Sequence, residues 1–279
     1  MQDSNGFDAY APAEVARRIE DFCVIKARMP FGSLFMLGVL AGAFIGLGAL
    51  MYTLVSGDTA LGFAAGRFLG GLGFSLGLVL VTIAGAELFT GNNLLAIAWA
   101  DGRLTTRAVL RNWAIVCAAN LVGAAGLALL VRLSGHTGMN AGAVGEAAVR
   151  IAVAKAHLSI GEAFFRGVLC NVLVCMAVWM AMAGRSVTDK AIAIVFPITA
   201  FVAAGFEHSI ANMYFFPLAM LLGAPLTWGD VLHNLVPVIA GNVLGGSVLV
   251  ALAYYAIYLW PSRRRTEPSP SPRAVRTPQ

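Results

Sequence analysis

Two short stretches place polar side chains inside long apolar runs of this 279-residue chain. The first reads GAELFTGNN at 85–93, and the second reads GFEHSIANM at 205–213. Each contains a glutamate, and the second adds an imidazole at His208. A charged group at the centre of a bilayer costs about 2.5–3.5 kcal/mol on insertion scales, so such residues usually have a function. We therefore expect the chemistry of this protein in these two stretches.

His208 is the candidate proton donor. Imidazole has an unperturbed pKa of about 6.5, so it can change charge near neutral pH and can donate to an anion or lend it a proton. Asn212 follows one helical turn later and adds an amide. The alternative for His208 is a core histidine with satisfied hydrogen bonds. Thr90 offers a hydroxyl that can rotate between backbone acceptors and a passing ion, or that can cap the helix after it.

Glu87 and Glu207 favour a structural interpretation. A carboxylate beside an interrupted helix can accept hydrogen bonds from the backbone N–H groups that the interruption frees. We expect both glutamates to hold the shape of the chain in this way, with direct proton transfer as the alternative.

The elements that position these residues follow from composition. The chain is 59% hydrophobic and 12% charged, against about 25% charged residues in soluble domains. Runs of about 20 apolar residues are long enough to cross a bilayer. We predict an all-α membrane protein with six transmembrane helices, on the apolar runs 31–55, 68–100, 112–131, 163–183, 191–225 and 235–260.

The second and fifth runs are longer than one membrane crossing. At 1.5 Å per residue each would reach about 50 Å as a straight helix, and each contains one of the two polar stretches. We predict that helices two and five are broken at membrane depth. Irregular backbone is tolerated there only where it is buried in protein or lines a cavity.

The two breaks correspond in sequence. Gly85, Glu87 and Asn92 precede Gly205, Glu207 and Asn212 by 120 residues each. Asn112 and Asn120 likewise precede Asn234 and Asn242 by 122, and GVLAG at 38 resembles GVLCN at 167. Each half has three spans, and because three is odd, the second half crosses the membrane in the opposite orientation. This pattern predicts an inverted 3+3 repeat with a permeation site at the interface of the repeats.

The ends of the chain and its charges predict the orientation. Residues 1–30 lack the apolar core of a signal peptide and favour an amphipathic helix from about Pro12 to Arg28 at the cytoplasmic surface. We expect residues 31–260 to form a six-helix transmembrane channel domain, and the Pro/Ser/Arg-rich tail 261–279 to be disordered and cytoplasmic. With both termini in the cytoplasm, the positive-inside rule is satisfied by all but five of the 19 Lys and Arg residues. Those five are Arg67, Arg132, Arg150, Lys155 and Arg166.

Other classes of site lack support. The four cysteines, Cys23, Cys117, Cys170 and Cys175, contain no CxxC pair, so we expect small core residues rather than disulfides or metal ligands. No nucleotide-binding loop or cofactor motif occurs, and we expect no cofactor and no metal site. The basic tail could suggest nucleic acid, but arginines beside a membrane span favour a topology anchor. Membrane lipid is the expected partner there.

Four stretches resemble the signature sequences of the formate/nitrite transporter family. They are GAELFTGNN, KAHLSIGEAFFRGVLCNVLVCMAVWMA, GRSVTDKA and FEHSIANMYFFPLAM, within a likeness over roughly residues 15–260. The resemblance implies an aquaporin-like fold, a homopentamer with one pore per subunit, and passage of small monovalent anions such as formate, nitrite or hydrosulfide. GRSVTDKA and the fourth span look closest to the formate branch, whereas ELFTGNN departs toward the nitrite and hydrosulfide branches.

The resemblance also implies roles for individual residues. It implies an apolar constriction toward the cytoplasm at Leu78, Leu88 and Val174, with Phe89 as a further constriction residue, and a second constriction at Phe74 and Phe201 toward the periplasm. Thr90 would sit in a mobile turn, and His208 would lie between the constrictions. Lys155, Asn171 and Asn212 would attract and guide anions, and Asn242 would face the pore.

Together these features predict a non-enzymatic transporter. We expect formate to pass as an anion or together with a proton, in a multi-pass protein of a bacterial inner membrane. A water or glycerol channel would carry NPA at both breaks, and neither has it. An intramembrane enzyme is the other alternative, but the chain contains no HExxH and no GxSxG.

Overall fold

Residues 9–260 are described in the computed structural model of this chain, and within that range the regular structure is helical. Six helices are long and apolar enough to cross a membrane, which confirms the predicted number of spans. They cover Phe31–Ser56, Phe63–Gly85, Thr106–Leu133, Ile160–Ala183, Val187–Ala204 and Trp228–Leu259. The protein is therefore a multi-pass membrane protein.

The individual elements follow in chain order. The α-helices are α1 (Pro12–Ala27), α2 (Phe31–Ser56), α3 (Phe63–Leu80), α4 (Ala96–Ala100), α5 (Thr106–Leu133), α6 (Ala143–Ala156), α7 (Ile160–Ala183), α8 (Val187–Ala204), α9 (Ser209–Leu221) and α10 (Trp228–Val243). Short 3-10 or π-helical segments complete them: η1 (Val81–Gly85), η2 (Gly91–Leu95), η3 (His136–Gly138), η4 (Asn140–Gly142), η5 (Leu244–Leu252) and η6 (Tyr255–Leu259).

Both long apolar runs leave the helical conformation at their polar stretch. In the first, the chain is non-helical from Ala86 to Thr90, between η1 and η2. In the second it is non-helical from Gly205 to His208, between α8 and α9. Gly85 and Gly205 stand at corresponding points with φ of 82° and 77°. That left-handed conformation costs glycine little, because it has no Cβ, and it ends each helix sharply.

The two halves of the chain pack in the same order. In the first half α2 packs against α3 and α5, and in the second α7 packs against α8 and α10. Glycine allows the closest approaches at corresponding places. A Cβ on Gly123 would collide with the carbonyl oxygen of Val39, and one on Gly245 with that of Val168. Small residues at such contacts let membrane helices approach backbone to backbone.

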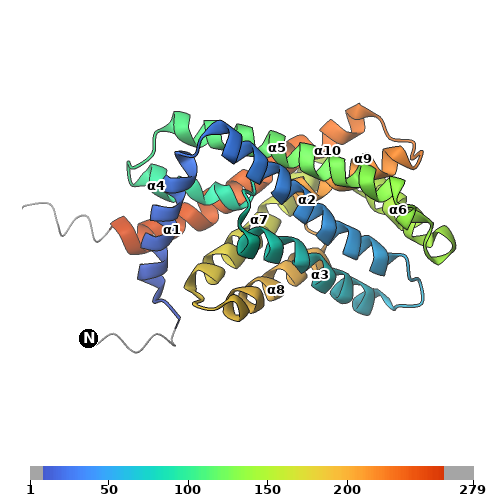
Figure 1. The fold of residues 1–279 in the computed structure, drawn as a ribbon, viewed down its shortest axis with the longest axis horizontal. Helices are drawn as coiled ribbons and strands as arrows, with labels where there is room; N and C mark the ends of the chain where they lie inside the picture. The colour runs from blue at the N-terminus through green and yellow to red at the C-terminus, as the bar shows by residue number, and fades with distance from the viewer. Residues whose placement is uncertain (1–8, 261–279) are drawn as a thin grey trace, which may run out of the picture.

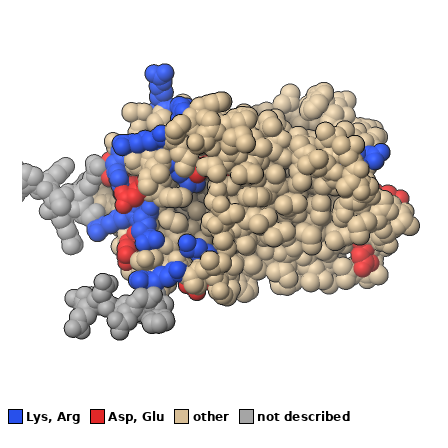
Figure 2. All heavy atoms as spheres, in the orientation of Figure 1, with Lys and Arg blue, Asp and Glu red and all other residues tan. Residues whose placement is uncertain are grey.

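Helix α1 lies across the end of the molecule where α4 and the last described turn of the chain also lie (Figure 1). Pro12 occupies its first turn, and one face of the helix is buried. Tyr10, just before it, donates its backbone N–H to the carbonyl of Ala183 at 3.0 Å. On the face shown in Figure 2, Lys and Arg gather at this end of the molecule and are sparse at the opposite end. The predicted tail 261–279 lies outside the described residues.

Candidate functional site

Glu87 is the centre of a buried polar network, which we call the first polar cluster: Lys26, Glu87, Asn92, Asn112 and Asn120. The Lys26 ammonium lies 3.2 Å from one Glu87 oxygen, and Asn92 donates to the other at 2.7 Å. The Asn92 amide also donates to Asn112 Oδ1 at 2.9 Å. The glutamate is 3% exposed, so its charge is compensated by a cation and an amide inside the protein.

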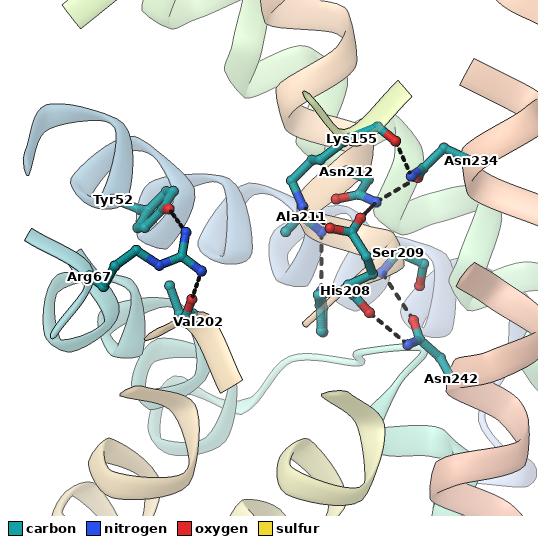
Figure 3. Close-up of polar contacts among 11 residues, drawn as sticks. Tyr52, Arg67, Lys155, Val202, His208, Ser209, Ala211, Asn212, Asn234 and Asn242 are labelled. Atoms are coloured by element: carbon teal, nitrogen blue, oxygen red, sulfur yellow. Dashed lines mark hydrogen bonds and ion pairs between the residues drawn. The ribbon is translucent and has the colours of Figure 1, made fainter. Parts of the chain in front are cut away.

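Glu207 repeats this arrangement in the second polar cluster: Lys155, Glu207, Asn212, Asn234 and Asn242. Lys155 donates to Glu207 Oε1 at 2.8 Å, and Asn212 donates to Oε2 at 2.7 Å. The Asn212 amide also reaches Asn234 Oδ1 at 2.7 Å. Figure 3 shows Lys155, Asn212 and Asn234 gathered together, with Asn242 beside Ser209.

Asn120 and Asn242 hold the interrupted backbone. Asn120 accepts from the N–H of Phe89 at 2.9 Å and donates to the carbonyls of Gly38 and Glu87. This is the function that we expected of the glutamates. The freed backbone groups are bound by asparagine amides instead, because an amide can both donate and accept whereas a carboxylate only accepts.

Asn242 makes the corresponding three bonds in the second half. It accepts from the N–H of Ser209 at 3.0 Å and donates to the carbonyls of Gly167 and Glu207. That Asn242 faces the pore stays a prediction. Its side chain is fully buried, and its amide serves the backbone.

His208 connects the two interrupted segments. Its Nε2 lies 3.0 Å from Thr90 Oγ1. Its Nδ1 accepts the backbone N–H of Ala211 at 3.1 Å, as Figure 3 shows. An amide N–H can only donate, so Nδ1 carries no hydrogen in this arrangement. The neutral ring is then the Nε2–H tautomer, and it donates to Thr90. The Thr90 hydroxyl hydrogen is left to donate elsewhere.

Thr90 does not cap the helix that follows it, because its hydroxyl makes no capping hydrogen bond there. Its side chain is fully buried and faces His208. Its carbonyl is held by the Asn171 amide at 3.2 Å and by the Cys175 thiol at 3.4 Å. Asn171 therefore contacts the segment that carries Thr90, and its guidance of anions stays a prediction.

The apolar residues assigned to constrictions are buried. Phe74 and Phe201 form an edge-to-face pair with ring centroids 5.6 Å apart, and Phe201 also stacks on His208 at 5.8 Å. The three residues of the other constriction belong to the same buried apolar cluster as this pair: Leu78, Leu88 and Val174. Phe89 packs against Trp113 of α5 at 6.5 Å.

A cavity of about 300 Å³ opens above the phenylalanine pair and His208. Its wall carries four of the five basic residues that the charge pattern places outside the cytoplasm: Arg67, Arg150, Lys155 and Arg166. We call it the basic cavity. Sequence reasoning missed this grouping, because these cations come from three different helices.

The carboxyl groups of Glu20 and Asp101 form a pair at the end of the molecule opposite the basic cavity, where α1 meets the α4–α5 loop. Arg103 lies 3.2 Å from Glu20 and 2.7 Å from Asp21. Burial first, and then the hydrogen bond and like charge of Asp101, raise the pKa of Glu20 from 4.5 to about 7, and Arg103 opposes this rise. Neither Glu20 nor Lys26 was singled out as a site residue from the sequence. Lys26 could have been found by its match to Lys155, since each lies 12 residues before a glycine of the GVLAG and GVLCN stretches.

Six apolar spans around a buried polar site define a membrane transport protein, and comparison with known proteins gives its family. The model of the family described as Formate/nitrite transporter matches residues 13–256. The formate channel FocA of Escherichia coli strain K12 is 39% identical over 279 residues, covering 93% of this chain and 98% of that one. A probable formate transporter of Methanothermobacter thermautotrophicus is 39% identical, covering 89% and 97%.

Solved structures agree with these relatives. A pentameric formate channel with formate bound has a TM-score of 0.76 and 37% identity, covering 82% of this chain and 98% of its own. An ion channel of the same family has a TM-score of 0.79 and 31% identity, covering 88% and 98%. The chain belongs to the formate/nitrite transporter family. It is a transporter rather than an enzyme, as the sequence predicted.

Proposed function

We propose that this chain is a channel for small monovalent anions of weak acids, formate above all, in a bacterial inner membrane with both termini in the cytoplasm. The observation that carries the proposal is the His208–Thr90 hydrogen bond of 3.0 Å, buried beside the Phe74–Phe201 pair at the base of the basic cavity. The names of the similar chains point to the same substrate.

The apolar constrictions set the barrier to permeation. A charged anion that enters a dry ring of phenylalanine or leucine side chains loses its hydration, which is costly. The neutral form of a weak acid avoids that cost. A group that protonates the anion between the constrictions therefore lowers the barrier, and His208 is the titratable side chain next to the Phe74–Phe201 pair.

The hydrogen bonds of His208 couple its charge to the anion. The ring gains charge by taking a hydrogen at Nδ1, which removes the bond from the Ala211 N–H, a loss of about 1–3 kcal/mol. An anion at the Thr90 hydroxyl offsets that loss by its attraction to the charged ring. The ring can then pass its Nε2 proton to the Thr90 hydroxyl, which gives its own proton to the anion, and the anion leaves as the neutral acid. The ring is left neutral with its hydrogen on Nδ1. It returns to the starting tautomer when Nε2 takes a proton from water and Nδ1 releases one to water, which restores the bond from the Ala211 N–H.

The same proposal includes assembly as a homopentamer with one pathway in each subunit. A structure to which this chain is similar is described as pentameric. Large apolar side chains are exposed on the spans, including Phe196 and Leu232, and they would face lipid or neighbouring subunits. Native mass spectrometry of the detergent-purified protein tests the subunit number, and a monomer would contradict it.

The test of function is transport by purified protein in liposomes. Formate, nitrite, hydrosulfide and acetate are compared over a pH series, and we expect formate flux to exceed acetate flux and to rise as the pH falls. Nitrite or hydrosulfide flux above formate flux would contradict the substrate assignment. Impermeant labelling of engineered cysteines tests the orientation, with residues 136–150 expected outside.

A further inference from the structure

The basic cavity holds more positive charge than one passing formate requires. Its wall contains Arg67 from α3, Arg150 and Lys155 from α6, and Arg166 from α7. The only carboxylate among the described lining residues is Glu207. Lys155 and Glu207 lie 2.8 Å apart and neutralise each other. The three arginines therefore remain as the excess positive charge of the cavity.

The partners of these arginines leave that charge largely uncompensated. Arg67 is fixed by neutral acceptors: the carbonyl of Ala203 at 2.9 Å, and the Tyr52 hydroxyl at 2.7 Å and the carbonyl of Val202 at 2.9 Å (Figure 3). Arg150 lies 4.0 Å from Glu146, and Arg166 lies 3.8 Å from Glu162; neither of these glutamates lines the cavity. Exposed pairs of this kind at i and i+4 contribute only a few tenths of a kcal/mol.

The size of the basic cavity and the side chains of its wall indicate which class of ligand it fits. A cavity of about 300 Å³ is at the lower end of the size range of small-molecule sites, so it has room for an anion larger than formate. Phe206 and Phe215 add apolar surface to the same wall as the phenylalanine pair. Guanidinium groups match carboxylates in shape and charge. Arginines from separate helices and aromatic side chains in one wall suit an anion that has a carboxylate at each end and an apolar middle.

We propose that the basic cavity is a binding site for a small dicarboxylate, which occupies the entrance above Phe74 and Phe201 and blocks it. A four-carbon dianion bridges two arginines with its carboxylates and lays its methylenes on the phenylalanine rings. It does not pass the constriction, because its neutral form requires two protons and its chain is longer than formate. Its effect on formate flux rests on the proposed function, whereas its binding does not.

Isothermal titration calorimetry of the protein in lipid nanodiscs, with succinate as the probe, measures binding without transport. We expect succinate to bind more tightly than sulfate, which has the same charge without an apolar middle, and than acetate. The double variant Arg150→Gln with Arg166→Gln is expected to weaken succinate binding on the order of tenfold. Arg132→Gln is the matched control, because Arg132 is exposed but does not line the cavity.

Two results would overturn the site. One is sulfate binding as tight as succinate binding, and the other is equal succinate affinity in the double variant and the wild type. In liposomes, the formate flux of each protein with succinate outside is divided by its flux without succinate. This ratio should fall in the wild type and in Arg132→Gln, and it should fall less in the double variant. Succinate binding in a protein that does not carry formate would contradict the proposed function and keep the site. Formate flux without succinate binding would remove the site alone.

Discussion

The first and second polar clusters repeat the same glutamate and asparagine contacts, yet only the second lies next to an imidazole. In each, a glutamate is paired with a lysine and an asparagine, and a further asparagine holds the interrupted backbone. The residue after the glutamate differs: it is Leu88 in the first half and His208 in the second. Two residues later, Thr90 in the first half has a hydroxyl, whereas the corresponding residue of the second half is the apolar Ile210.

This difference distinguishes the residues that hold the interrupted backbone from those that we propose act on the anion. The clusters repeat because each interrupted helix frees backbone groups that have no water to bind at membrane depth. The imidazole and the hydroxyl do not repeat, which agrees with the proposed function, because a proton donor and its hydroxyl partner would be needed only once, where the two segments meet. We infer that matched residues hold the fold and unmatched residues act on the anion.

Replacing the backbone-holding asparagines should have the largest effect. Asn120→Leu and Asn242→Leu each leave three buried backbone groups without their partner and should lower the free energy of unfolding by about 4 kcal/mol. Circular dichroism during denaturation in detergent measures this, with Ser247→Ala as a buried control that loses one bond. A large loss from only one asparagine would show that the halves are not equivalent.

Removing one glutamate charge comes next. Glu87→Gln and Glu207→Gln each leave a lysine with side-chain exposure of 14% or 15% without its counter-charge, at a cost of about 3 kcal/mol. Combining each change with Lys26→Met or Lys155→Met should recover much of that loss. The same unfolding experiment tests this, and double variants less stable than the single ones would refute the ion-pair explanation.

His208→Asn tests the residue that has no match. Asparagine keeps a hydrogen-bonding side chain but cannot titrate, so formate uptake at low pH should fall on the order of 100-fold, leaving a leak that does not depend on pH. Liposome flux across a pH series measures this, and gel filtration checks assembly. Wild-type pH dependence in a properly assembled variant would eliminate the proton-transfer role of His208.

The apolar constriction beside Leu88 should respond more weakly. Leu78→Ala with Leu88→Ala removes methylenes from a buried apolar cluster and should raise acetate leak on the order of tenfold, as expected for selection by size. Flux ratios of formate to acetate measure the change. An unaltered ratio would mean that these leucines do not set the size limit.

The smallest effect should be the pH dependence of α1, the helix that supplies Lys26, compared with α6, the helix that supplies Lys155. Glu20 in α1 has a raised pKa of about 7, whereas the corresponding position of α6, six residues before its lysine, is Val149. A raised pKa in the folded state stabilises the fold at low pH, and that contribution is lost as the pH rises from about 4.5 to 7.

Docking of α1 should therefore weaken over this pH range by about 1 kcal/mol, since solvent screening reduces the effect of the shift, and α6 should not change. Hydrogen exchange of α1 and α6 at pH 5 and pH 8 measures both helices. Glu20→Gln should remove the pH dependence of α1. An equal response of α6 would assign the effect to the whole protein.

The sequence determined the class, the six spans and the position of the polar stretches, because long apolar runs must cross the membrane and polar groups within them need partners. It also supplied the matching residues, since spacing alone relates Glu87 to Glu207 and Asn120 to Asn242. It did not show which groups these side chains bind. Glutamate and asparagine can both hold a broken backbone, and only their positions in space show that the asparagines do so.

Only the tertiary structure decided which distant residues meet. Thr90 and His208 are 118 residues apart, and their hydrogen bond depends on how the two interrupted segments approach each other. The basic cavity likewise joins arginines from α3, α6 and α7, which a charge count could assign to one side of the membrane but not to one site. Local sequence sets local conformation and hydrophobic pattern, whereas contacts between distant residues depend on the packing of every helix between them.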